Sequence, residues 1–558
     1  MQALNQALAA GYAAMQRGDL AAARQILSRE RHPKAVHLLA LVEKAAGNVS
    51  AAASLFEKAA SLDPNDPEIA NNQGVLAMQT GHMAVAETAF RRALGLNPAF
   101  IQAGTALGRL LIDEERWDEA ATVYDDLIER EPENFVIRFG HATVLLGTGQ
   151  ADAAEAVFNA LLAENSDLAE ARFMRGRARL EQGRVEEALA DLEDANVASP
   201  SELSLKTLAG ALWMTGDRAG FESLLAQAAK QPELVVTAAE LLRQSGDPQA
   251  AVGALDALRR DHHLAPESWI VAATAYVDAN EPVLAEQAAR ACLNEAPDNR
   301  IVKGSLITAL LMQGRAEDAL DVTLPMREAE PNGQHWIAYE ATALRLLGRA
   351  EYDSLVDLDR FVRAYTLPVP EGFESLEAFN AAFLEALDRW HPYKVHPLDQ
   401  SLRDGSQTPR DLTTIDDPVF HAFVAALDEP IRQYMADVGD GDDHPLTARN
   451  TGSYRIAGSW SVRLKGGGWH VNHVHPEGWI SSAYYVTVPE ETRTGDDKAG
   501  WIKFGEPPFS TVPPSPPQKW VRPEAGVLVL FPSFLWHGTV PIRDESLRVT
   551  APFDAVPA

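Results

Sequence analysis

The chain has 558 residues, of which 49 are lysine or arginine and 79 are aspartate or glutamate, so its formal charge is −30. A chain of this length predicts two or more domains. So acidic a chain is not expected to bind nucleic acid or an anionic membrane surface, whereas basic proteins or peptides stay open as partners.

The composition also bears on the cellular compartment. Cys292 is the single cysteine, so an intrachain disulfide is excluded and a reducing compartment is expected. Residues 1–20 lack a basic segment followed by a continuous apolar one, so we expect an amphipathic helix there and not a signal peptide. No stretch approaches the ~18 apolar residues of a membrane span. We therefore expect a cytoplasmic protein without a membrane partner.

Residues 1–360 are expected to form an array of helical repeats. A turn residue recurs about every 34 residues, which is the period of tetratricopeptide repeats, in which a tight turn joins two helices. About ten or eleven helix pairs would stack into a superhelix, whose concave surface commonly holds peptides or proteins. The turn positions are Gly47, Gly81, Glu115, Gly149, Gly183, Gly216, Gly246, Asn280, Gly314 and Gly348.

A connector and a helix are expected over residues 361–395, where the repeat register fades. Residues 364–379 carry proline, glycine and glutamate, which is typical of a connector, and residues 376–390 have a helical pattern. Residues 396–558 are expected to form a β domain. Within it, residues 416–438 are amphipathic and predict a helix that braces the outer face of the sheets.

Three histidines lie close together in the segment HVNHVH, namely His470, His473 and His475. A strand-like run over residues 480–488 follows at once. Side chains alternate along a strand, so His473 and His475 can point to the same side, whereas His470 has the wrong spacing to join them without a bulge. Two imidazoles on one side of a strand make half of a metal site.

A candidate for the other half lies downstream. An apolar strand and a turn in residues 527–541 lead to His537, and Arg548 follows eleven residues later in another alternating strand. The alternation would place Arg548 and Thr550 on one face of that strand and Val549 on the other. A guanidinium fork at such a place matches a carboxylate bidentately.

Taken together, these segments resemble the Fe(II)/2-oxoglutarate oxygenases, which are built on a double-stranded β-helix (jelly roll). The resemblance covers roughly residues 396–558 and is greatest to the oxygenases of bacterial tetratricopeptide proteins, in the prolyl-hydroxylase-like superfamily. In these families a His-x-Asp/Glu pair and a distal histidine hold iron. An arginine about ten residues past the distal histidine binds the far carboxylate of 2-oxoglutarate. The resembling segments are QSLRDGSQT, GSWSVRL, HVNHVHP, SSAYYV, FPSFLWHGTVP and LRVTAPFD.

The ligand set departs from the family pattern, because His475 stands where these families place aspartate or glutamate. Three assignments are open. In the first, His473, His475 and His537 all bind iron. In the second, only two of the histidines bind, as in the similar aspartyl/asparaginyl β-hydroxylases, which lack the carboxylate ligand. In the third, His475 and Glu477 form the His-x-carboxylate pair, with His537 as the distal ligand and His473 beside them.

The resemblance also implies roles for residues around the metal. Arg548 would anchor 2-oxoglutarate, with Tyr485 and Thr550 as further contacts to it. Beyond the metal and cosubstrate ligands, no catalytic residue is predicted. Residues expected beside the ligands or facing the substrate are His470, Trp479 and Trp536.

The implied function is that of a 2-oxoglutarate-dependent dioxygenase using Fe(II), 2-oxoglutarate and O2, which hydroxylates a protein or peptide presented by the repeat array. A long, proline-rich insertion over residues 489–523 is expected to rim the active-site mouth. Two alternatives stay open. One is an oxygenase for a small metabolite, with the array serving localisation. The other is a non-catalytic repeat scaffold with a degenerate oxygenase domain.

Overall fold

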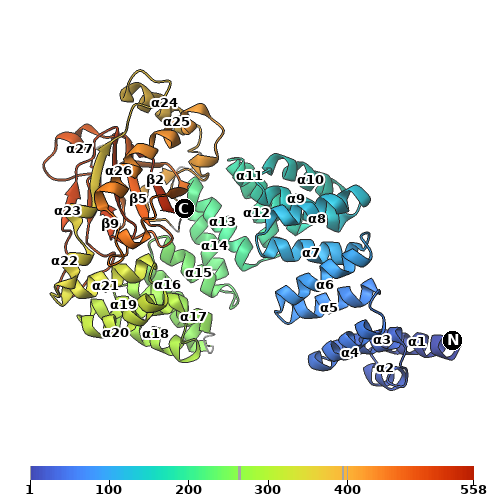
Figure 1. Cartoon of the computed structure of the whole chain (residues 1–558). Helices are drawn as coiled ribbons and strands as arrows, with labels where there is room; N and C mark the ends of the chain where they lie inside the picture. Colours follow the sequence, from blue (N-terminus) through green and yellow to red (C-terminus); the bar gives the residue numbers. More distant parts are fainter. Residues whose placement is uncertain (1, 262–265, 392–394, 397, 399, 544) are drawn as a thin grey trace. The chain divides into compact units, whose positions relative to one another are not determined.

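The computed structural model describes residues 2–261, 266–391, 395, 396, 398, 400–543 and 545–558. They form two compact units, Met1–Ala198 and Ser199–Ala558. The first unit is helical, and the second contains further helix pairs followed by antiparallel β-sheets (Figure 1). Among the described helices, none is both long and apolar enough to cross a membrane. The predicted fold class, a repeat array followed by a β domain with bracing helices, is confirmed.

The first unit is a row of antiparallel helix pairs, in which each helix packs on the next one along the chain. Small residues let the two helices of a pair approach closely. A Cβ on Gly74, for example, would lie 2.6 Å from the ring of Phe90. The helices are α1 (Gln2–Gln16), α2 (Leu20–Leu27), α3 (Pro33–Ala45), α4 (Val49–Leu62), α5 (Pro67–Gln79), α6 (Met83–Leu96), α7 (Ile101–Asp113), α8 (Trp117–Arg130), α9 (Phe135–Gly147), α10 (Ala151–Glu164), α11 (Ala169–Glu181) and α12 (Val185–Ala198).

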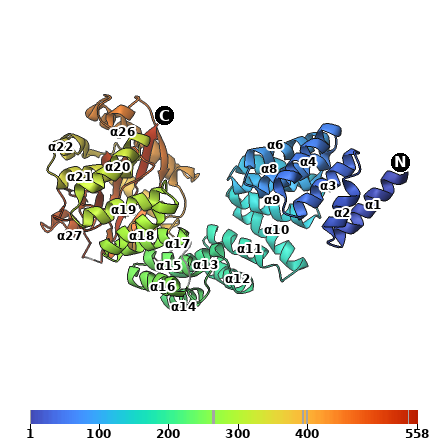
Figure 2. The same ribbon diagram turned by 90° about the horizontal axis from the view of Figure 1, so that it is seen from below.

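The second unit begins with helices of the same kind. Figures 1 and 2 both show α19 and α21 beside the strands of this unit. The helices are α13 (Glu202–Thr215), α14 (Arg218–Ala228), α15 (Val235–Gln244), α16 (Pro248–Asp261), α17 (Pro266–Asp278), α18 (Pro282–Glu295), α19 (Arg300–Met312), α20 (Ala316–Ala329), α21 (Gln334–Leu346), α22 (Glu351–Leu355) and α23 (Leu358–Phe361).

Each turn position predicted from the repeat period adopts a left-handed backbone conformation. The eight glycines have φ between 64° and 91°, and Glu115 and Asn280 have φ of 57° and 59°. This conformation is costly for residues with a Cβ, which explains why glycine recurs at the turn between the two helices of a unit. The predicted turns of the array are thereby confirmed.

A matched pair of glycine substitutions tests this explanation. Gly246, in the α15–α16 turn, has φ of 91°, whereas Gly253 lies within α16; a Cβ at either position meets no heavy atom within 4 Å. We expect Gly246→Ala to lower the free energy of unfolding by about 1 kcal/mol. Gly253→Ala is expected to raise it by about 0.5–1 kcal/mol. Hydrogen exchange of the α15 and α16 amides measures both changes, and equal effects of the two alanines would contradict the explanation.

The β domain consists of two antiparallel sheets. In the larger one the strands run in the order β1-β8-β5-β10-β4-β2, with β11 pairing with both β3 and β5; the smaller sheet has the order β7-β6-β9. The predicted strand over residues 480–488 is β5. The strands are β1 (Arg363–Thr366), β2 (Leu402–Gln407), β3 (Tyr454–Ser459), β4 (Val462–His470), β5 (Ile480–Thr487), β6 (Ile502–Phe504), β7 (Lys519–Val521), β8 (Val527–Pro532), β9 (His537–Thr539), β10 (Arg548–Thr550) and β11 (Phe553–Pro557).

Helices brace the larger sheet, as the sequence predicted. The helix expected over residues 376–390 is α24 (Leu376–Asp388), whose Asn380 accepts a hydrogen bond of 2.6 Å from Tyr484 on β5. Residues 416–438 form two helices and not one: α25 (Pro418–Ala426) and α26 (Asp428–Val438) are separated by a single residue, Leu427. Shorter elements are α27 (Glu490–Thr494) and the 3₁₀ helices η1 (Leu412–Thr414) and η2 (Thr447–Arg449).

A single hydrophobic core joins the later repeats to the β domain. Its buried residues extend from Ala239 on α15 to Ala555 on β11 and include the fully buried Trp336 on α21. Cys292 on α18 belongs to this core, so its thiol is buried as a small apolar group. The division into residues 1–360, 361–395 and 396–558 stays a prediction. Its last boundary adjoins residues 392–394, 397 and 399, which lie outside the described residues.

Candidate metal centre

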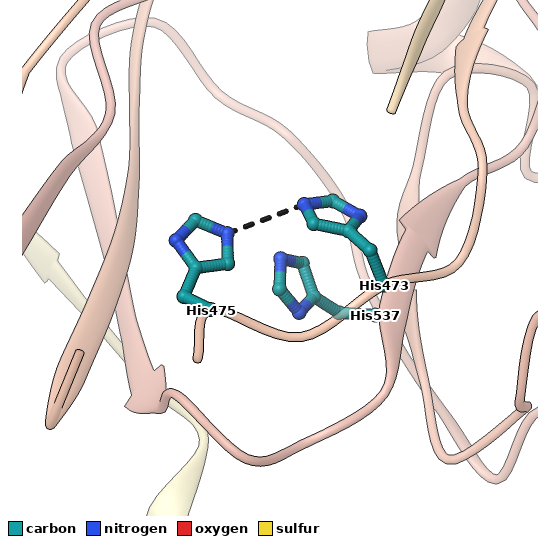
Figure 3. A group of neighbouring side chains, drawn as sticks. All are labelled: His473, His475 and His537. Atoms are coloured by element: carbon teal, nitrogen blue, oxygen red, sulfur yellow. Dashed lines mark hydrogen bonds between the residues drawn. The ribbon is translucent and has the colours of Figure 1, made fainter. Parts of the chain in front are cut away.

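The histidine segment reaches its position by leaving one strand and pairing with another. β4 ends at His470, and His473 then forms an isolated bridge with His537 at the start of β9. The His473 N–H donates to the His537 carbonyl over 2.8 Å, and the reverse bond is 3.0 Å. The segment is therefore not the continuous strand that the alternation argument assumed. The side chains of His473, His475 and His537 nevertheless converge, as Figure 3 shows.

The three imidazoles form a group with the spacing of a metal site. One nitrogen from each ring lies within 4.8 Å of the others, and the Nε2 atoms of His473 and His475 are 3.2 Å apart. Among the described residues this is the group of histidine, cysteine and carboxylate side chains that meets such a spacing. Glu477 does not belong to it: its side chain is exposed and lines the same cavity.

Backbone carbonyls fix the tautomer of two of these rings. Nδ1 of His473 lies 2.8 Å from the Val471 carbonyl, and Nδ1 of His537 lies 2.9 Å from the Leu535 carbonyl. A carbonyl only accepts, so each Nδ1 carries the proton and each Nε2 presents its lone pair to the centre of the group. Hydrogen bonds on the far nitrogen are what commonly orient metal-binding histidines.

A carboxylate orients the third ring, that of His475, by accepting a hydrogen bond from its Nδ1. Nδ1 of His475 donates to Oδ2 of Asp554 over 2.6 Å, and Oδ1 of Asp554 accepts a bond of 2.7 Å from Ser481, which lies opposite Asp554 in the β11–β5 register. A ligand set of three imidazoles has no negative charge of its own. Asp554 supplies one behind His475, which makes that imidazole a better electron donor.

Burial keeps the imidazoles of His473 and His537 in the form that binds metals. Loss of solvent, and to a smaller extent neighbouring His475, lowers the pKa of His473 to about 3. Burial likewise places the pKa of His537 well below its usual value, with His473 and His475 acting in the same direction. Neutral rings with an available Nε2 are ready to coordinate a cation at neutral pH.

Replacing Asp554 with asparagine tests the role of its charge. The amide is nearly isosteric and can still accept from Nδ1 of His475, but it removes the negative charge. We expect the affinity for Fe(II) or Co(II) to fall about 10- to 100-fold, as measured by anaerobic titration of the apoprotein. Glu477→Gln is the matched control, because it neutralises an exposed carboxylate of the same cavity. Equal losses in the two variants would refute a specific role for Asp554.

The histidines line a cavity of about 470 Å³, and Arg548 is another of its lining residues. Arg548 is only 3 % exposed, and its Nε and Nη1 have no hydrogen-bond partner among the described residues. Tyr485 is fully buried beside Arg548, with its ring centroid 5.1 Å from Cζ of the guanidinium, but it is not among the described residues that line the cavity. Burial lowers the pKa of Arg548, but a guanidinium remains protonated at neutral pH. Unpaired buried nitrogens are rare, and those of Arg548 are available to an anionic ligand of the cavity.

Alternation along β10 places Thr550 on the cavity side with Arg548 and buries Val549. Ser482 also lines the cavity, but its hydroxyl is already engaged. It donates to the Phe553 carbonyl over 2.8 Å and accepts from the Phe553 N–H over 2.7 Å. Thr550 therefore lies where an additional hydroxyl contact to a cavity ligand is expected, whereas Ser482 serves the sheet.

Several cavity residues were not singled out from the sequence. Ser401 places its hydroxyl 3.1 Å from Nδ1 of His470 and 3.3 Å from Nε2 of His473. Trp460 stacks on His475, with ring centroids 5.9 Å apart. Two sequence features could have pointed to such residues. Ser401 lies in one of the segments that carry the family resemblance, and Asp554 continues the even spacing of Arg548 and Thr550.

Two tryptophans that flank the histidines in sequence lie elsewhere. Trp479 is 1 % exposed and donates to the Leu446 carbonyl, and Trp536 donates to Thr342 of α21. The cavity lining among the described residues includes His470 but neither tryptophan. Neighbouring positions in the chain point to opposite sides here, so sequence proximity to a ligand did not predict proximity to the cavity.

Comparisons with known proteins agree with this architecture. Residues 458–554 match the family model described as "Putative 2OG-Fe(II) oxygenase". Residues 37–99, 111–175 and 236–300 match models described as "Tetratricopeptide repeat". The chain therefore combines tetratricopeptide repeats with a C-terminal domain of this oxygenase family, and the resemblance found in the sequence is confirmed.

Similarity to individual proteins is partial. The chain is 28% identical over 197 residues to Protein FlbA of Caulobacter vibrioides, covering 35% of this chain and 33% of FlbA. It is 22% identical over 271 residues to the DnaJ homolog subfamily C member 3 of Bos taurus, covering 42% of this chain and 53% of that protein. The chain thus spans a third to about half of the length of these curated relatives.

Tetratricopeptide repeat proteins are among the solved structures with similarity to this chain. A tetratricopeptide repeat protein from Parabacteroides merdae is 16% identical, with a TM-score of 0.32, over 56% of this chain and 100% of its own. YrrB, described as a TPR protein with an unusual peptide-binding site, is 21% identical, with a TM-score of 0.27, over 32% of this chain and 94% of its own.

Proposed function

We propose that this protein is an Fe(II)- and 2-oxoglutarate-dependent oxygenase that hydroxylates a protein or peptide substrate. The observation that carries the proposal is the pairing of two features in one cavity. Three imidazoles converge in it, and a buried arginine with two unpaired nitrogens lines the same cavity. The match of residues 458–554 to the oxygenase family supports the same assignment.

The donor set fits the implied metal and cosubstrate. Imidazole nitrogens suit Fe(II), and Nε2 of His473, His475 and His537 would hold it. The guanidinium of Arg548 would bind the far carboxylate of 2-oxoglutarate, with the hydroxyls of Tyr485 and Thr550 beside it. When bound, iron, 2-oxoglutarate and O2 supply the oxidising chemistry, in which 2-oxoglutarate becomes succinate and CO2 and a substrate C–H becomes C–OH.

The residues of the chain orient the metal-binding imidazoles, limit the access of water and offer a surface to the substrate. The carbonyls of Val471 and Leu535 and the carboxylate of Asp554 hold the three rings in their tautomers. The apolar side chains of Ile502 and Phe531 line the same cavity and limit the access of water. Trp460 forms a flat wall against His475 on which a substrate group can rest.

A polypeptide substrate is favoured by the position of the cavity rim. Burial lowers the pKa of His335 on α21, and the carboxylates of Glu330 and of Glu477 on the rim oppose that shift. The rim therefore lies within electrostatic range of a repeat helix. Arrays of this kind present extended surfaces to polypeptides, and this general property supports a polypeptide substrate.

The proposal is tested with apoprotein reconstituted with Fe(II). We expect succinate to form from 2-oxoglutarate in an iron- and O2-dependent manner, and proteins of the native host to gain 16 Da. Arg548→Ala is the negative control for both readouts. Oxidation of small metabolites alone would favour the localisation role of the array. Failure of the reconstituted protein to bind iron would overturn the enzyme assignment and leave a repeat scaffold.

A further inference from the structure

One hydrogen bond links the repeat array to the residue that precedes the candidate metal ligand His537. Nε1 of Trp536 donates to Oγ1 of Thr342 on α21 over 2.9 Å, and both side chains are buried. Trp536 immediately precedes His537. Its ring packs edge-on against Tyr339 of α21 and against Phe509 of the proline-rich insertion, at centroid distances of 5.9 and 6.2 Å.

A second contact joins the same helix to the neighbouring strand. Arg345, near the end of α21, donates to the carbonyl of Gly505 over 2.6 Å and to that of Pro516 over 2.8 Å. The N–H of Gly505 in turn donates to the Trp536 carbonyl over 2.8 Å. Because Phe504 on β6 lies opposite His537 on β9, α21 is attached to both strands of the pair that carries this histidine.

His475, the third candidate ligand, has a ring partner outside this strand pair. The rings of His473 and His475 are bonded to the Val471 carbonyl and to Asp554, both within the β domain. His473 and His537 are joined by two backbone hydrogen bonds, so movement of α21 relative to the larger sheet would shift these two nitrogen donors relative to that of His475, whose ring is held by Asp554 on β11. Metal sites tolerate errors of only about 0.2 Å in ligand distance, so a small shift is enough to change the affinity.

We propose that α21 positions the metal ligand His537 and does so through Trp536, so that the last repeats are part of the metal centre and not only a platform for substrate. This inference rests on the metal site of the proposed function. Thr342 and Trp536 are positioning residues in it, since neither one touches the cavity. An interface that merely holds the two parts together would affect folding without affecting the metal.

The chain offers a matched control for this distinction. Nε1 of Trp213 on α13 donates to the His396 carbonyl over 2.8 Å in a buried contact that also joins a repeat helix to the C-terminal region. Trp213→Phe and Trp536→Phe therefore each remove one buried indole hydrogen bond between a repeat helix and the C-terminal region, to a backbone carbonyl in the first case and to a threonine hydroxyl in the second. Only the bond made by Trp536 lies next to a candidate metal ligand, His537.

The experiment titrates full-length apoprotein with Co(II) and follows affinity, the visible ligand-field spectrum and thermal unfolding of the apo form. We expect Trp536→Phe and Thr342→Val to weaken Co(II) binding about tenfold and to shift the spectrum. Thr342→Ser, which keeps the hydroxyl, is expected to restore both. Trp213→Phe is expected to lower the unfolding temperature without changing affinity or spectrum.

The outcomes separate this inference from the function on which it rests. If Thr342→Val and Trp536→Phe bind Co(II) as tightly as Trp213→Phe does, the positioning role is refuted while the metal site stands. If the wild-type protein binds no Co(II), the metal site itself is refuted, and the inference falls with it.

Discussion

Replacement of His537 with alanine is expected to reduce the affinity for Fe(II) by at least about a hundredfold, because it removes one of three nitrogen donors and not merely a neighbour of one. The effect should be larger than that of Asp554→Asn. Anaerobic titration of the apoprotein, followed by the visible band that forms when 2-oxoglutarate is added, measures it. His473→Ala and His475→Ala are expected to behave in the same way.

Two variants make this result specific. His421 is exposed on α25, and its alanine variant should bind iron normally. Glu477→Ala distinguishes between the open ligand assignments. Retained binding supports three histidines, whereas loss at Glu477 together with tolerance of His473→Ala would move the site to His475, Glu477 and His537. Normal binding by His537→Ala would contradict every assignment that includes it.

Arg548→Met is expected to have two effects of opposite sign. The affinity for 2-oxoglutarate should fall by about two orders of magnitude, since loss of a buried, charge-assisted partner of a carboxylate costs about 2–5 kcal/mol. The apoprotein should become more stable, because a buried guanidinium with unpaired Nε and Nη1 is replaced by an apolar side chain of similar length. Calorimetric titration with 2-oxoglutarate and thermal unfolding measure the two effects.

The control for this prediction is Arg543, the other arginine near the end of the chain. Its side chain is 70 % exposed and paired with Asp497, so Arg543→Met should leave both quantities nearly unchanged. Arg548→Lys keeps the charge but loses the planar fork, and an intermediate affinity is expected. An Arg548→Met variant that binds 2-oxoglutarate normally would exclude Arg548 as the anchor.

Periodic and local features were predictable from the sequence. The turns of the array follow from a regular spacing, and the left-handed conformation at Gly246 or Asn280 is a local property of that turn. The pairing of Arg548 with Thr550 on one face of β10 follows from strand alternation. In each case the information lies within a few residues of the position concerned.

Contacts between distant segments were not predictable in this way. Asp554 reaches His475 because β11 pairs with β5, and no spacing within either segment indicates that register. Trp536 was expected near the ligands because of its place in the chain, but its indole is directed toward α21 instead. Side chains at successive positions can point into different regions of the molecule, and tertiary packing determines which region each one enters.

The continuous core from α15 to β11 has a consequence for how this gene could change. Tetratricopeptide arrays lengthen and shorten by duplication or loss of whole units, since each unit contacts only its neighbours. Around α21 that freedom is absent, because Trp336 and its surroundings are packed in the same core as the β domain. Insertion or loss of a unit is therefore expected to be tolerated within residues 1–198 and to be selected against near the end of the array.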